Sequence, residues 1–113
     1  MTREDELERR LSAVAFGERR ALLEQLLHQH LDGNDGTTIT ALAAATGTNR
    51  FTASRHLSVL RDAGLVRADA AGTRRLHRID LDAMWSLDEW LYPFIDAAGR
   101  DALEADTSVG QRA

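Results

Sequence analysis

The sequence has no cysteine among its 113 residues, no lysine, and a single proline. The absence of cysteine excludes disulfide bonds, thiolate metal sites and a cysteine nucleophile. No apolar run approaches the roughly 20 residues of a membrane-spanning helix, and the charged first residues do not resemble a signal peptide. We therefore expect a cytoplasmic protein with no membrane partner.

Sequence motifs of the common enzyme classes are also missing. The chain has no glycine-rich phosphate loop and no His-Glu-x-x-His motif. Ser54 and His56 are two positions apart on one predicted helix, where side chains diverge, so they do not form a catalytic pair. We therefore predict that the protein is not an enzyme and holds no cofactor.

Basic residues are concentrated in one segment of an otherwise acidic chain. The net charge is −4, with 14 arginines against 18 acidic residues. Residues 50–78 contain seven arginines and two aspartates, a local net charge of +5, which leaves −9 for the remainder. A basic segment on an acidic body is the charge pattern expected of a small DNA-binding protein, because arginine neutralises phosphates.

The stretch from residue 49 to residue 67 predicts one capped helix with two different faces. One face is an apolar stripe, Ala53, Leu57 and Leu60. The opposite face carries side chains suited to phosphates and base edges: Phe51, Ser54, Arg55 and Ser58. Asn49 is a good N-cap, and Gly64 is a good residue to end the helix. A β-prone segment follows at once, which is typical of a recognition helix that runs into a β-wing.

Hydrophobic periodicity and turn residues predict a mainly α fold with a small β-hairpin wing (α+β), made of five helices and one hairpin. The first helix is expected to begin at a capping box formed by Thr2 and Asp5, and the next three helices are expected over 18–31, 39–46 and about 50–63. The last helix is expected from Asp80 or Asp82 onward. The strands are expected over 65–69 and 74–79, with 70–73 as the wing tip. Pro93 is expected to kink the last helix or to end its first segment. We place one folded domain at residues 1–98 and a flexible tail at 99–113.

The predicted DNA-binding region resembles the core of ArsR/SmtB-type bacterial regulators. The resemblance covers roughly residues 7–95, and its most specific part is Ser54-Arg-His-Leu-Ser-Val-Leu-Arg-Asp-Ala-Gly-Leu-Val66. The stretch Leu87-Asp-Glu-Trp-Leu-Tyr-Pro-Phe94 is similar to the last helix of family members that lack metal ligands there. The resemblance implies a winged helix-turn-helix transcriptional regulator that acts as a homodimer on a palindromic operator.

The resemblance also implies a role for each segment. The recognition helix, about 50–63, would enter the major groove, and the wing, 65–79, would lie on the backbone or in the minor groove. The residues that would contact double-stranded operator DNA are Thr48, Asn49, Arg50, Phe51, Ser54, Arg55, Ser58, Arg74 and Arg75. The residues that would form the dimer interface are Leu7, Leu11, Trp85 and Leu91. For Trp85, packing within one protomer is an equally good interpretation.

The chain departs from the family where metal ligands would stand. The third helix has no cysteine pair, and no histidine follows His77, so the resemblance does not carry metal sensing with it. His28 and His30 remain as candidate ligands for nickel or zinc. A polar helix end is the simpler interpretation, because residues two apart on a helix point to different sides.

Two alternatives to a plain DNA-binding regulator therefore stay open. One is a metal-responsive regulator that uses His28 and His30, and the other is a winged-helix protein-interaction module without DNA binding. In a regulator without a metal, a small-molecule effector or a partner protein would supply the signal. His56 is expected to touch DNA or a neighbouring helix, and His77 to be structural or to lie near a phosphate.

Overall fold

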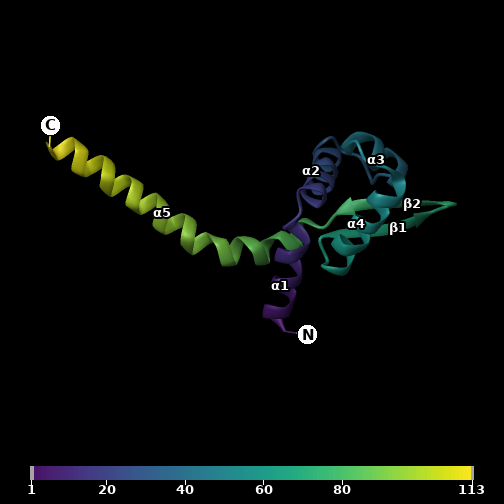
Figure 1. Ribbon diagram of the computed structural model, residues 1–113, viewed down its shortest axis with the longest axis horizontal. Coiled ribbons are helices and arrows are strands. Elements are labelled where there is room, and N and C mark those ends of the chain that lie inside the picture. Colours follow the sequence, from purple (N-terminus) through teal and green to yellow (C-terminus); the bar gives the residue numbers. More distant parts are fainter. Residues whose placement is uncertain (1, 113) are drawn as a thin grey trace.

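The computed structural model describes residues 2–112, and the side chains of residues 2–106. Within these residues the elements are α1 (Arg3–Val14), α2 (Gly17–Leu31), α3 (Ile39–Thr46), α4 (Arg50–Asp62), β1 (Val66–Ala71), β2 (Arg74–Ile79), the 3-10 turn η1 (Leu81–Ala83) and α5 (Met84–Arg112). Helices α2, α3 and α4 gather with the hairpin at one end of the molecule, and α5 extends away from them (Figure 1). The predicted mainly α fold with a β-hairpin is confirmed.

Local capping interactions fix the ends of several helices. The Thr2 hydroxyl accepts a hydrogen bond from the Asp5 amide, and the Asp5 carboxylate accepts one from the Thr2 amide, each at 3.1 Å. This reciprocal pair is the predicted capping box at the start of α1. The Asn49 side-chain oxygen accepts from the Thr52 amide at 2.8 Å and so begins α4. Gly47, with φ 72°, takes the left-handed conformation that ends α3.

The core lies between α2, α3, α4 and the base of the hairpin. Its large aliphatic side chains with less than 2% exposure are Leu22, Leu26, Leu42, Leu57, Leu60 and Leu65. Burial of each such side chain contributes about 1.5–3 kcal/mol. Because two of the six come from α4, the inner face of this helix is held firmly, and the helix presents its opposite face outward.

The hairpin is longer than the sequence predicts. Pairing continues from Val66 opposite Ile79 to Ala71 opposite Arg74. The predicted four-residue tip is therefore wrong, since only two residues connect the strands. Gly72, with φ 65°, supplies the positive φ that a two-residue hairpin turn needs, so the strands pair up to the turn.

Helix α5 continues past the end expected near residue 99. It runs without interruption from Met84 through Pro93 and Gly99 to Arg112, so Gly99 does not interrupt the helix. Alanine and other strong helix formers on both sides of Gly99 compensate for its low helix propensity. The division between a domain at 1–98 and a flexible tail at 99–113 coincides with no helix end and stays a prediction.

The length of α5 sets the outline of the molecule. The radius of gyration is 18.4 Å and the extents are 67 × 33 × 24 Å, whereas a compact chain of this size has a radius of about 13 Å. The helix changes direction along its length (Figure 1), as expected where Pro93 removes a backbone hydrogen bond. Despite this length, no helix in the described part of the chain is apolar enough to cross a membrane.

Candidate nucleic-acid interface

The outer face of α4 has the character predicted for it. Its inner stripe, Ala53, Leu57 and Leu60, is completely buried. On the other side Asn49, Arg50, Phe51 and Arg55 are exposed, and Thr48, Ser54 and Ser58 are half-buried. The structure thus brings the seven predicted contact residues of this helix and its N-terminal turn to one accessible surface. We call this surface the α4 outer face.

Two side-chain contacts fix α4 to its surroundings. His56 Nε2 lies 2.6 Å from Glu18 Oε2 on α2. The structure thus shows the predicted contact of His56 with a neighbouring helix, while a contact with DNA stays a prediction. Arg61 Nη1 lies 3.2 Å from His77 Nε2 on β2. The helix is therefore tied to α2 on one side and to the wing on the other, which limits how far its outer face can tilt.

His77 is the least accessible polar residue of the wing. It is 0% exposed, and its backbone pairs with Thr37 through hydrogen bonds of 2.8 and 2.9 Å. Burial lowers the pKa of His77, and the charges of Arg61 and Arg75 lower it further, against the opposing effect of a hydrogen bond with the Thr37 backbone. The imidazole of His77 thus contacts Arg61 at the end of α4, while its backbone pairs with the loop before α3, so this residue has the structural role that the sequence left open.

Five arginines of the basic segment are free to bind phosphate. In the segment 50–78, all of which the structure describes, Arg61 faces His77, and Arg78 Nε lies 3.2 Å from Asp69 Oδ2. The exposed arginines of this segment that make no hydrogen bond or ion pair are Arg50, Arg55, Arg67, Arg74 and Arg75. All of them except Arg67 are among the predicted DNA contacts.

The hairpin register separates the two arginines of the wing. Arg74 pairs with Ala71 and Arg75 with Ala70. Successive side chains of a strand point to opposite faces, so Arg75 shares a face with His77, and Arg74 shares the other face with Arg78. The sequence predicts one role for both arginines, whereas the register places them on opposite faces of the hairpin.

Comparison with known proteins supports this geometry. A model described as a helix-turn-helix domain matches residues 17–68. The HTH-type transcriptional regulator Rv2034 of Mycobacterium tuberculosis is 35% identical over 105 residues, which cover 83% of this chain and 92% of the relative. A solved domain of Mb0332 from Mycobacterium bovis, described as homodimeric, DNA-binding and from a possible ArsR-family regulator, is 31% identical with a TM-score of 0.63. The alignment covers 90% of this chain and 85% of that domain.

The chain belongs to the ArsR family of winged helix-turn-helix transcriptional regulators. The fold extends to an ArsR-like regulator from Rhodococcus sp. RHA1, with a TM-score of 0.67 at 22% identity over 94% of this chain and 93% of that one. The family assignment that the sequence motif suggested is therefore confirmed. In this ArsR-family member α4 is the recognition helix and the hairpin β1–β2 is the wing.

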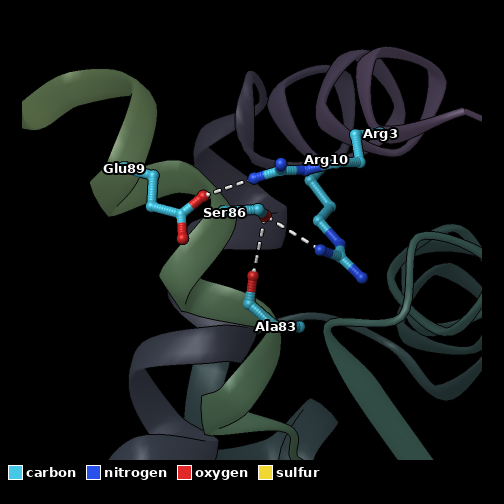
Figure 2. A network of polar contacts seen from close by, with 5 residues as sticks. All are labelled: Arg3, Arg10, Ala83, Ser86 and Glu89. Carbon is cyan, nitrogen blue, oxygen red and sulfur yellow. Dashed lines mark hydrogen bonds and ion pairs between the residues drawn. The ribbon is translucent and has the colours of Figure 1, made fainter.

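A polar network connects α1 and α5 with the end of the recognition helix. Arg10 donates to the Ser86 hydroxyl at 2.8 Å and to the Ala63 carbonyl at 3.0 Å. Figure 2 shows Arg10 reaching Ser86 on α5, while Ser86 in turn donates to the Ala83 carbonyl at 3.0 Å. Arg3 also pairs with Glu89 at 3.0 Å. The contacts of Arg3 and Arg10 were not predictable from local sequence, because each joins residues more than fifty positions apart in the chain.

The predicted dimer residues lie on α1 and α5 with unequal exposure. Leu7 and Leu11 are half-buried, whereas Trp85 is 65% and Leu91 47% exposed. The exposure of Trp85 makes packing within one protomer the poorer of its two interpretations. Trp90 and Phe94 contact each other, with ring centroids 5.1 Å apart, and both remain exposed.

The two histidines of α2 do not come together. His30 lines a cavity of about 340 Å³ between α2, the following loop and the start of η1. His28 lines a different cavity, between α2 and α3. Among the residues that the structure describes, no group of three or more potential ligands is placed to hold a metal ion. The metal-responsive alternative therefore gains no support from the geometry.

Proposed function

We propose that the protein binds a palindromic operator as a homodimer, with α4 in the major groove and the wing on the backbone or in the minor groove. The observation that carries the proposal is the α4 outer face, where exposed polar and basic side chains stand opposite a completely buried apolar stripe. The proposed contacts are Thr48, Asn49, Arg50, Phe51, Ser54, Arg55, Ser58, Arg74 and Arg75. The first helical turn, which meets base edges in such complexes, is the most exposed part of this face.

Charge supports the same assignment. Arg50, Arg74 and Arg75 of each protomer would place six guanidinium groups near phosphates in a dimer, while Arg55 meets a base edge. Neutralising that many phosphates predicts a slope of about −5 when the logarithm of the binding constant is plotted against the logarithm of salt concentration. An acidic body limits adhesion elsewhere on the protein, so the basic segment sets the orientation on DNA.

Exposed apolar residues on α5 support dimerisation. Trp90, Leu91, Tyr92, Phe94 and Ile95 are each between 47% and 60% exposed. Because successive residues of a helix are about 100° apart, these five side chains span an arc of roughly 200°, more than half of the circumference. An apolar face this wide is normally buried. The side-chain hydrogen bonds between α1 and α5 lie near the start of α5, at Ser86 and Glu89. A second copy of the chain would cover the remainder, and the similar Mb0332 domain is described as homodimeric.

We infer a role in regulation rather than catalysis, and a cytoplasmic location that gives access to chromosomal DNA. No cofactor is part of the proposal. The signal that would change the affinity for DNA stays a prediction: it is either a small-molecule effector or a partner protein. The geometry favours neither the metal-responsive alternative nor a protein-interaction module, because the unpaired arginines of the α4 outer face have no role in such a module.

Selection from a random duplex library tests the proposal directly. The protein should enrich one palindromic sequence and bind it in a fluorescence titration with the steep salt dependence given above. The double variant Arg50→Ala/Arg55→Ala should lose this affinity, whereas Arg9→Ala, an exposed arginine of α1, should retain it. Equal affinity for selected and unrelated duplexes, or an equal loss in the Arg9 variant, would contradict the proposal.

A further inference from the structure

Phe51 is the most exposed large hydrophobic side chain in the described part of the chain. Its exposure is 77%, compared with 71% for Leu31 and 60% or less for the aromatic residues of α5 other than Trp85. The aromatic contacts found in residues 2–106 join Trp90 with Phe94 and Arg19 with Phe16, and none involves Phe51. The ring therefore contributes little to folding and stands in solvent on the α4 outer face.

The position of Phe51 directs its ring outward from the first turn of α4. Asn49 is the N-cap, Arg50 is the first helical residue and Phe51 the second. Ser54 and Arg55, three and four positions later, lie on the same side of the helix. If α4 enters the major groove, its first turn meets base edges, so the phenyl ring faces bases while the neighbouring arginines reach phosphates or bases.

A phenyl ring restricts what can be read at that point. Phenylalanine has no side-chain donor or acceptor, so it cannot distinguish the hydrogen-bonding patterns of the base edges. The C5-methyl group of thymine is the apolar feature that the major groove presents, and apolar side chains contact it. A base without this methyl group leaves the ring facing polar atoms or water, with no compensating interaction.

We propose that Phe51 is a specificity-determining residue that reads a 5-methylpyrimidine, thymine in ordinary DNA, in each half-site of the operator. This inference rests on the proposed function and deepens it, because it names a base feature that the recognition helix selects. Removal of one such methyl group should weaken binding about fourfold, the factor expected for one buried methyl-sized group. Removal from both half-sites should weaken binding about fifteenfold, because the two contacts are related by symmetry and far apart.

Deoxyuridine substitution provides the test, since uracil differs from thymine only in lacking the methyl group. The duplex enriched by the protein is synthesised with each thymine replaced in turn by deoxyuridine, symmetrically in both half-sites. Wild-type protein should show one thymine position with a loss of about fifteenfold. At that position, 5-methylcytosine should bind tighter than cytosine by the same factor, because it restores the methyl group on a different base.

The variant Phe51→Ala assigns the effect to this side chain. It should bind thymine and uracil duplexes equally and keep the melting temperature of the wild type, because the removed ring is exposed. Leu31→Ala, which removes an exposed apolar side chain at the end of α2, should keep the full discrimination. Equal binding of thymine and uracil duplexes by the wild type, or unchanged discrimination in Phe51→Ala, would overturn the inference while leaving operator binding intact. Failure of the library to yield any preferred duplex would instead remove the proposed function, and this inference with it.

Discussion

Replacement of His77 by glutamine should remove a pH-dependent part of the stability of the protein. His77 is buried between β2, Thr37 and Arg61. Glutamine keeps a polar side chain near Arg61 but cannot titrate. At about pH 7.5 we expect the variant to be less stable by about 1–3 kcal/mol, because a hydrogen bond to a charged group is altered in a packed site.

The direction of the pH effect follows from the lowered pKa of His77. In the unfolded chain the imidazole has its ordinary pKa of 6.5, whereas in the folded chain burial, then Arg61 and Arg75, lower the pKa. Below pH 6.5 the unfolded chain therefore binds a proton that the folded chain does not, and the free energy of unfolding falls. By about pH 5.5 the loss from this one group reaches at most about 1.4 kcal/mol.

Urea unfolding of both proteins at a series of pH values measures this effect. The stability difference between wild type and His77→Gln should be largest above pH 6.5 and should shrink by up to about 1.4 kcal/mol as the pH falls. His56→Gln serves as a control for a histidine that pairs with Glu18 at the surface. A difference that stayed constant with pH, or that grew on acidification, would refute the conclusion that His77 is neutral in the folded protein.

Other expectations concern DNA, assembly and metals. Arg55→Ala should weaken operator binding by about 1–3 kcal/mol for each half-site, the cost of a lost bidentate base contact, and normal binding by a folded variant would remove Arg55 from the interface. Arg74→Ala and Arg75→Ala should each weaken binding to all sequences alike and reduce the salt slope by about two units, because both protomers lose the contact; a change of base preference would show instead that the wing reads sequence. Sedimentation should give twice the 12.5 kDa chain mass, and Trp85→Glu should shift the protein toward monomer; a wild-type monomer that binds a palindrome tightly would contradict dimerisation. Calorimetry should detect no tight binding of cadmium, because sulfur ligands are missing, and at most weak nickel or zinc binding at the α2 histidines; sub-micromolar binding that released DNA would identify a metal sensor.

The elements that the sequence predicts well depend on local chemistry. Asn49 and Gly64 bound the recognition helix because a side-chain cap and a positive φ act within a few residues. The capping box at Thr2 and Asp5 is local in the same way. The apolar stripe of α4 follows directly from helical periodicity, and so does the face that remains exposed.

The errors and omissions have equally physical causes. The sequence predicts that the tip of the wing begins at Ala70, two residues before the observed turn. Pairing between the strands, rather than the low β-propensity of Ala70 and Ala71, decides where a strand ends. Gly99 does not end α5, since single-residue propensity is a weak determinant inside a long helix. The pairs His77–Arg61 and His56–Glu18 escaped prediction because they join residues 16 and 38 positions apart.

The junction at Arg10 bears on which operators the protein would tolerate. One guanidinium group holds the end of the recognition helix, at the Ala63 carbonyl, and the start of α5, at Ser86 (Figure 2). With α1 and α5 as the dimer interface, the separation of the two recognition helices would be set through this short rigid connection. Half-site centres in such operators lie about one helical turn, roughly 34 Å, apart. A dimer built this way could not adjust the separation of its recognition helices to an operator with one inserted base pair between the half-sites. A substitution at Arg10, which lies away from the DNA, would therefore allow other half-site spacings before it changed the preferred bases.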